Sequence, residues 1–142
     1  MKVAGTWALA IPLAGCAGMP AGGTSPEVAV MRAAAAAPRG VSGTYVMTVR
    51  ATGRQDNHLY LNSKNDYRDQ RDLTIDVPPG VEDELAARLH ASVPEALTGK
   101  RIAVRGVARR IRIGFMANGM MTGKYYYQTH VTLGAANQLS VR

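Results

Sequence analysis

A mainly β domain with one helix, preceded by a flexible tether, is the fold class that the sequence predicts. Three observations predict it. From Gly43 onward, apolar residues alternate with polar ones, as in half-buried strands. Between residues 79 and 93 the apolar spacing becomes three to four, which marks one face of a helix. Residues 17–42 hold few large apolar side chains and therefore cannot build a packed core. The predicted order is β-β-β-α-β-β.

The first three strands are delimited by alternation and by turn residues. Residues 43–51 alternate over their whole length and predict the first strand. A polar turn at 53–57 separates it from a short second strand at 58–62. A charged turn at 63–69 follows. Leu73, Ile75 and Val77 then form the third strand, which ends at Pro78-Pro79 because proline cannot continue a sheet ladder.

The predicted helix opens at Pro79-Gly80 and ends at Pro94. Val81, Leu85 and Leu89 are spaced along one face, and we expect Leu85 and Leu89 to pack on the core. Three acidic residues occupy the first turn, where the helix dipole favours negative charge. Proline inside a helix removes a hydrogen bond and clashes with the preceding turn, so Pro94 is expected to break the helix.

The second half of the chain predicts two further strands. Residues 100–113 form a long strand whose Ile102 and Val104 point inward, and Gly106 marks a bulge or a sharp bend. The Gly- and Met-rich residues 115–123 are expected to be a loop. Residues 125–133 form the fifth strand, and residues 138–141 offer one last short pairing.

The N-terminus reads as a targeting signal. Lys2 is a short positive segment, and Val3 to Pro12 is apolar but well short of the roughly 20 residues needed to span a bilayer. The ending Leu13-Ala14-Gly15-Cys16 resembles the lipobox of bacterial lipoproteins in all four positions. An ordinary secretory signal peptide followed by a cysteine is the alternative. We therefore assign residues 1–15 to a lipoprotein signal peptide.

The lipoprotein resemblance implies that Cys16 is lipidated and becomes the first residue of the mature chain. Acyl chains on one residue give stable membrane attachment. Ala17 follows, with no Asp at that position. In lipoproteins of cells with two membranes, this favours the outer membrane, with the domain facing the periplasm. The resemblance thus implies a lipid-anchored protein of the cell envelope.

Residues 16–42 are expected to form the lipidated cysteine and a flexible tether. Met19 to Pro26 is rich in Gly, Ala and Pro and reads as a linker. Val28 to Ala37 has helix propensity, but an isolated helix of that length is marginal in water. We therefore expect a frayed helix that ends before Pro38 and is not needed for folding of the domain at residues 43–142.

Several segments of that domain resemble small uncharacterised domains of the oligonucleotide/oligosaccharide-binding (OB) type. The segments are Leu59-Tyr60-Leu61-Asn62, Asp66-Tyr67-Arg68, Leu73-Thr74-Ile75, Leu97 to Val107, and Gln128-Thr129-His130-Val131. The resemblance implies a five-stranded Greek-key barrel over residues 43–142. A different small β-barrel or a split β-sandwich is the alternative architecture.

The residues that carry enzymatic chemistry are present but not clustered. His58, His90 and His130 each stand without a second metal ligand at helical or hairpin spacing. The aspartates at 66, 69 and 72 do not match a calcium loop. None of the serines lies in a Gly-x-Ser-x-Gly elbow. The sequence therefore predicts a protein that is not an enzyme and uses no metal or cofactor.

Basic and aromatic residues of the last two strands are the candidates for ligand binding. Alternation places Arg110 and Arg112 on one face, and Tyr125 and Tyr127 lie in the next strand. With Tyr60, they could stack on bases or sugars while the arginines follow anionic groups. The alternative is that the arginines keep a sheet face soluble and the tyrosines plug the rim of a barrel.

Net charge is +7, and removing residues 1–15, which carry only Lys2, leaves 7 − 1 = +6. A basic surface favours acidic partners without choosing among them. We expect a membrane-anchored, non-catalytic binding or interaction domain for a glycan, an anionic polymer or an envelope protein. Single-stranded nucleic-acid binding is the alternative, natural to the fold but disfavoured outside the cytoplasm.

Overall fold

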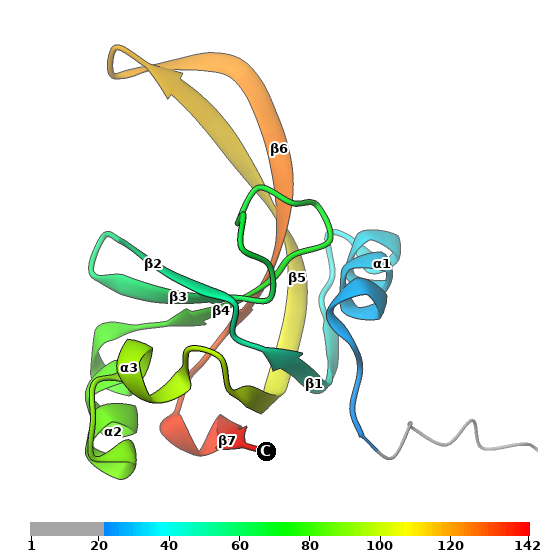
Figure 1. Cartoon of the computed structure of the whole chain (residues 1–142). Helices are drawn as coiled ribbons and strands as arrows, with labels where there is room; N and C mark the ends of the chain where they lie inside the picture. The colour runs from blue at the N-terminus through cyan, green and yellow to red at the C-terminus, as the bar shows by residue number, and fades with distance from the viewer. Residues whose placement is uncertain (1–21) are drawn as a thin grey trace, which may run out of the picture.

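The computed structural model describes residues 22–142, which form one seven-stranded sheet with three α-helices and a short 3-10 helix around it (Figure 1). The strands are β1 (Val41–Thr48), β2 (Ala51–Gln55), β3 (His58–Asn62), β4 (Leu73–Val77), β5 (Arg101–Ala117), β6 (Met120–Thr132) and β7 (Leu139–Val141). The helices are α1 (Pro26–Ala36), α2 (Pro79–Leu89), α3 (Val93–Leu97) and η1 (Ala136–Gln138). The predicted signal peptide and Cys16 lie outside the described residues.

The strand order is β1-β5-β6-β4-β3-β2, with β7 added to β5. β4 and β6 pair in parallel, and the other paired strands are antiparallel. β1 and β2 occupy the two ends of this order, although only Val49 and Arg50 separate them in the chain. Within residues 22–142, no strand pairing joins β1 to β2, so the sheet is not closed.

The mainly β class is confirmed, but the expected count of five strands and one helix is wrong. The turn expected at 53–57 is shorter than predicted. Residues 53–55 belong to β2, because the reversal needs only Asp56 and Asn57, both at positive φ. Pro94 lies in the first turn of α3 instead of ending a helix, and α2 already ends at Leu89. A proline is tolerated in the first helical turn, where its missing N–H has no partner to lose.

The core lies between one face of the sheet and the helices. Ile102 and Val104 are fully buried and Leu85 is nearly so, which confirms the predicted inward residues. Leu89 packs against this core from a partly buried position. A bulge or a sharp bend was expected at Gly106. β1 and β5 stay in one register through this residue, so their pairing contains no bulge there.

α1 packs on the sheet, whereas a frayed helix within a flexible tether was expected. Ala29 and Ala33 are both 0% exposed and belong to the hydrophobic core, where their small side chains allow close approach to β1 and β5. Ser25 caps the helix by accepting a hydrogen bond from the backbone of Val28. Thr24 exchanges backbone hydrogen bonds with β1. The folded unit therefore begins near residue 24.

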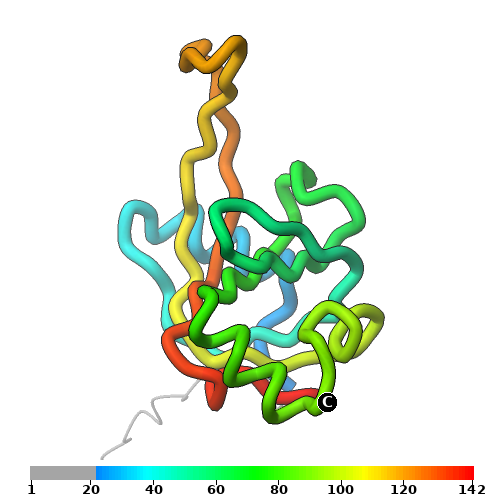
Figure 2. The backbone as a smooth tube through the Cα atoms, turned by 90° about the vertical axis from the view of Figure 1, so that its left-hand side faces the viewer, coloured from blue at the N-terminus to red at the C-terminus, as the bar shows by residue number. Residues whose placement is uncertain are grey.

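A two-stranded arm extends β5 and β6 beyond the body of the molecule (Figures 1 and 2). We call residues 109–128 the arm, because β1 pairs β5 only as far as Ala108 and β4 pairs β6 only from Thr129. The expected loop at 115–123 is instead the end of this arm. Asn118 and Gly119 form its turn, both at positive φ, as two-residue hairpin turns require.

Candidate ligand-binding cleft and Arg–Tyr stack

Four of the predicted site residues come together on one face of the arm. Arg112 pairs with Tyr127 across the two strands, and Gly114 pairs with Tyr125. The guanidinium carbon of Arg110 lies 4.2 Å from the centre of the Tyr127 ring, and that of Arg112 lies 4.7 Å from the Tyr125 ring. We call these four side chains the Arg–Tyr stack. Each arginine covers one tyrosine face in cation–π geometry.

The Arg–Tyr stack is accessible to a partner. Tyr125 is 50% exposed and Tyr127 is 38% exposed, and their rings meet edge to face at 5.6 Å. Of the four ion pairs among the described residues, none includes Arg110 or Arg112. The stack therefore offers guanidinium groups that an external anion can reach.

Tyr60 lies apart from the Arg–Tyr stack, in a cleft on the other face of β6. Successive strand residues point to opposite faces, so Tyr126 and His130 face away from Tyr125 and Tyr127. Tyr60 contacts His130, with ring centres 5.8 Å apart. The five predicted binding residues thus divide between two surfaces.

The cleft has a volume of about 380 Å³ and lies between β2, β3, the loop before β4 and the base of the arm. Aromatic rings and side-chain amides dominate its wall. Its lining residues are Ala51, Thr52, Gly53, Arg54, Gln55, Tyr60, Asn62, Asn65, Tyr67, Thr74, Ile113, Tyr126, Gln128 and His130. A lining of this kind combines flat apolar faces with neutral hydrogen-bonding groups.

Gln128 holds one side of the cleft in a defined geometry. Its amide nitrogen donates to the Tyr126 hydroxyl at 2.8 Å, and its amide oxygen lies 2.7 Å from Nε2 of His130. Because that oxygen accepts, Nε2 of His130 carries the proton. Burial lowers the pKa of His130, which keeps the imidazole neutral. Nδ1 of His130 is then an acceptor.

The opposite side of the cleft is built around Tyr60. Its ring stacks beside that of His58, with centres 6.2 Å apart. Nδ1 of His58 lies 2.6 Å from a carboxylate oxygen of Asp76 on the neighbouring strand, which fixes the imidazole. Burial raises the pKa of the Tyr60 phenol, so it stays protonated and can donate.

A buried polar cluster supports the floor of the cleft. Asp72 is 3% exposed and accepts hydrogen bonds from the Ser63 hydroxyl and the Lys64 backbone, both at 2.9 Å. The Thr74 hydroxyl lies 3.0 Å from Asp72 and 2.9 Å from the amide oxygen of Asn62. Burial raises the pKa of Asp72 to about 6, although these hydrogen bonds act to lower it. The cluster fixes Asn62 and Thr74, which line the cleft.

The cleft lining contains no Asp, Glu, Ser or Cys among the residues that the structure describes. Its one cationic residue, Arg54, donates to Glu82 at 2.9 Å. Over residues 22–142, no group of three His, Cys, Asp or Glu side chains is placed to hold a metal ion. In the same part of the chain, no helix is long and apolar enough to cross a membrane.

Sequence reasoning missed most of the cleft. The residues predicted to bind a ligand did not include Tyr67, Tyr126, Gln128 or His130. Alternation along the fifth predicted strand nevertheless places Tyr126 on the face opposite its two neighbours. The loop that carries Tyr67 and Asn65 has no pattern that would place it over β3.

Two comparisons of the sequence with known proteins give no match. No protein-family model matches its sequence. No curated protein matches it either.

Proposed function

We propose that this chain is a membrane-anchored lipoprotein of the cell envelope whose folded domain binds a ligand without transforming it. The lipobox-like Leu13 to Cys16 supports lipid attachment, on the outer membrane and facing the periplasm where a cell has two membranes. The cleft beside Tyr60 is the observation that carries the binding role.

We further propose that the domain is an OB-type barrel. Its support is the parallel pairing of β4 with β6, the helical segment between β4 and β5, and the order of the strands. In this proposal β1 and β2 are two halves of one bent strand that joins both ends of the sheet. Folds of this type bind oligosaccharides and oligonucleotides on the face where the cleft lies.

A glycan is the ligand class that suits the cleft best. Tyrosine rings offer flat apolar faces to the C–H faces of sugar rings, and the polar edge of each tyrosine can still hydrogen-bond. The amides of Asn62, Asn65 and Gln128 both donate and accept, as sugar hydroxyl and acetamido groups do. The lining thus matches a neutral ligand rich in hydroxyl groups.

The chemistry of the lining favours binding over catalysis. Glycoside hydrolysis in most enzymes uses two carboxyl groups, one on each side of the scissile bond. Two carboxyl groups stand close to the lining, and both are engaged. Asp76, which pairs with Tyr60 across the sheet, contacts His58 and accepts from Thr132. Asp72 is held by Ser63, Lys64 and Thr74. We therefore propose a non-catalytic domain.

The lipid anchor is tested by replacing the predicted acylation site. Cys16→Ser should move the protein from the detergent-extracted membrane fraction to the soluble fraction, because the acyl chains supply the attachment. Mass spectrometry of the native protein should find an acylated N-terminal cysteine. Unmodified Cys16 in the native protein would refute the anchor.

Glycan binding is tested by calorimetry with soluble envelope glycans and peptidoglycan fragments. Tyr60→Ala and Gln128→Ala should each weaken binding at least tenfold, since each removes a wall of the cleft. Tyr125→Ala is the matched control, because this tyrosine lies on the opposite face of β6. Salt should change the affinity little, as expected for a neutral ligand. Binding that survives both cleft substitutions would exclude the cleft.

Single-stranded nucleic-acid binding is the second candidate, and the Arg–Tyr stack is the observation that favours it. Basic grooves with stacking aromatic rings bind single strands without sequence preference. Such binding should weaken steeply as salt rises. It should also be lost in the double variant Arg110→Gln/Arg112→Gln, whereas Tyr60→Ala should leave it unchanged. Titration of a labelled oligothymidylate at two salt concentrations provides the measurement.

A further inference from the structure

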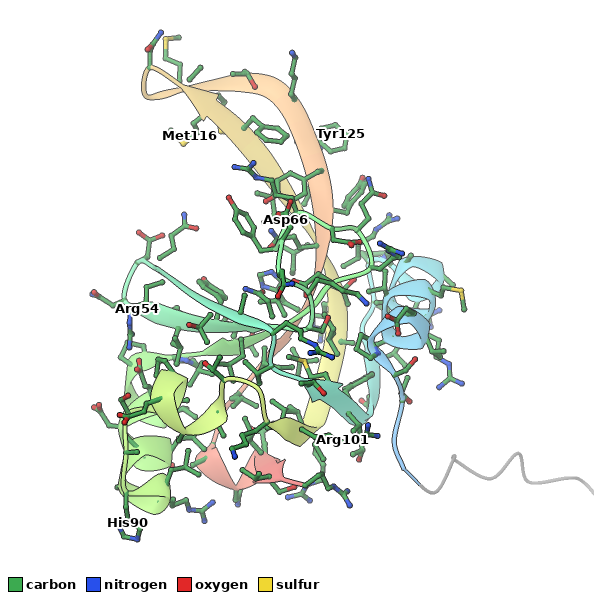
Figure 3. The ribbon with its side chains drawn as sticks, viewed as in Figure 1. Arg54, Asp66, His90, Arg101, Met116 and Tyr125 are labelled. Carbon is green, nitrogen blue, oxygen red and sulfur yellow. The ribbon has the colours of Figure 1, made fainter. Side chains whose placement is uncertain are left out.

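One side of the molecule carries both the Arg–Tyr stack and the start of the described chain. Figure 1 shows α1 and the segment at residue 22 on the same side of the sheet. Figure 3 places Tyr125 on that side of the arm and Arg54, which lines the cleft, on the other. Tyr125 and the first described residues therefore lie on one side of the sheet, and Arg54 at the cleft lies on the other.

The arm belongs to a strongly cationic half of the protein. All ten acidic residues precede residue 96 in the sequence, the last being Glu95. Eight basic residues follow, with no acidic residue to offset them: Lys100, Arg101, Arg105, Arg109, Arg110, Arg112, Lys124 and Arg142. A surface of one sign attracts a partner of the opposite sign over distances of about a Debye length.

Exposed aromatic and apolar groups lie beside the two arginines of the Arg–Tyr stack and on α1. Met31 is 66% exposed and lies opposite the buried Ala29 and Ala33 on α1, since it is two residues from each in the helix. Tyrosine is enriched where a bilayer meets water, and arginine side chains reach from there to phosphate groups. The combination is suited to a lipid headgroup layer.

The length of chain outside the structure restricts how the domain can sit. Thr24 is the first residue hydrogen-bonded to the sheet, and it lies 24 − 16 = 8 positions after Cys16 in the sequence. Eight residue steps of fully extended chain span at most about 28 Å. A lipid on Cys16 would keep the side that carries α1 close to its bilayer.

We propose that the Arg–Tyr stack and the outer face of α1 dock on the anionic surface of the bilayer that holds the protein, leaving the cleft turned outward. The position of the bilayer rests on the proposed lipid anchor, but the docking surface itself needs no acyl chain. Lipid attachment and a basic patch then form two cooperating membrane signals. The cleft remains open to ligands that approach from the aqueous side.

Vesicle binding by the full chain with Cys16→Ser tests the docking surface. The protein should bind vesicles of phosphatidylglycerol and phosphatidylcholine more tightly than vesicles of phosphatidylcholine alone. Arg110→Gln/Arg112→Gln should lower the partition coefficient on anionic vesicles about 30-fold, because two surface cations are lost. Arg110→Lys/Arg112→Lys keeps the charge and should keep most of the binding.

Arg88→Gln/Arg101→Gln is the matched control. It removes the same charge from two exposed arginines, one on α2 and one at the far end of β5 from the arm. Partition should fall less than about threefold. The apolar segment before residue 16 is common to all variants, so differences between them report the substituted surface. An equal loss in both double variants would mean attraction by net charge alone and would overturn the proposal.

A tryptophan probe tests the orientation. Trp7 is the one tryptophan in the chain, so Trp7→Phe provides a background without this fluorophore. On anionic vesicles that contain brominated lipids, Tyr125→Trp should be quenched and Tyr60→Trp should not. Quenching of the Tyr60 probe instead of the Tyr125 probe, or of neither, would overturn the proposal.

These results are independent of the proposed function. Chains with Ser at position 16 report docking whether or not the native cysteine is acylated. Glycan titration in solution reports the cleft whether or not the stack meets lipid. Binding of the stack to oligothymidylate but not to anionic vesicles would overturn membrane docking and assign the stack to nucleic acid.

Discussion

Gly106 and Val131 approach so closely that a Cβ atom on Gly106 would lie 2.7 Å from a methyl carbon of Val131. Val131 is fully buried, so this methyl group cannot swing away into solvent. Glycine at position 106 therefore serves close packing of β5 against β6, where the sequence suggested a bulge or a sharp bend.

Gly106→Ala should destabilise the fold by about 1–3 kcal/mol, the usual cost of overpacking a core. The measurement is the free energy of unfolding by urea, followed by circular dichroism. Gly53→Ala is the control, because nothing lies within 4 Å of a Cβ at that position and its strand is exposed. It should change the free energy by less than about 0.5 kcal/mol. Equal effects at both positions would contradict the packing argument.

Protonation of Asp72 should contribute to the pH dependence of stability. Its folded-state pKa of about 6 lies above the ordinary value of 3.8, so between these values the folded protein binds the proton more tightly than the unfolded chain. The contribution of this group to stability is full below about pH 4 and is lost as the pH rises through 6. A shift of two units corresponds to about 3 kcal/mol.

Asp72→Asn should remove this dependence and leave the protein at least as stable as the wild type at pH 7.5. An asparagine oxygen can accept from Ser63 and Lys64, and its amide nitrogen can donate to the Thr74 hydroxyl, which then donates to Asn62. Thermal unfolding at pH 4.5 and 7.5 provides the comparison. A wild-type protein whose stability rises between these two values, with the variant parallel to it, would show that Asp72 titrates normally.

Because α1 packs on the sheet, the stability cost of a substitution should differ sharply between its buried and exposed faces. Ala33→Asp places a carboxylate in the core beneath α1 and should cost at least about 3 kcal/mol. Met31→Asp lies on the exposed face and should cost less than about 1 kcal/mol. Urea unfolding measures both. If Ala33→Asp were harmless, α1 would be the frayed segment that its sequence suggests.

Truncating a side chain on the inward face of β5 should destabilise the fold more than truncating one at the edge of the core. Ile102→Ala should cost about 2–5 kcal/mol, since Ile102 is fully buried. Leu89→Ala should cost less, because Leu89 only flanks the core. Unfolding free energies measured under one condition test the order. The opposite order would mean that α2 carries more of the core than β5.

The sequence predicts β3, β4 and the start of α2 at the bounds that the structure has. Each is marked by alternating apolar residues or by a proline, and both signals are local. The signals that fail are those that depend on distant neighbours. α1 consists largely of alanines. Their small side chains contribute to the core only because the sheet packs closely against Ala29 and Ala33, and the local sequence does not show this.

The arm shows why alternation cannot predict every strand. Residues 115–123 pack on no core, so they need no apolar period, and the register shifts between Gly114 and Met116. Asn118-Gly119 was the available signal, because this dipeptide favours a two-residue hairpin turn. β2 is largely exposed and escaped detection for the same reason as the arm.

The candidate site was half predictable. Arg110, Arg112, Tyr125 and Tyr127 stand together because period two and antiparallel pairing dictate it. The cleft needs the loop with Tyr67 to meet Gln128 from β6, a contact across 61 residues of sequence. No local pattern encodes such a contact.

The parallel pairing of β4 with β6 has a consequence for how the chain folds. Asp76 pairs with Thr132, so 132 − 76 = 56 residues must be traversed before this pairing forms. Closing a loop of that length costs chain entropy before any contact repays it. β2, β3 and β4 can form a local meander early, but one edge of β4 stays unpaired until β6 arrives. We therefore expect the insertion of β6 between β4 and β5 to limit the folding rate, and the edge of β4 to be the surface at risk of aggregation until then.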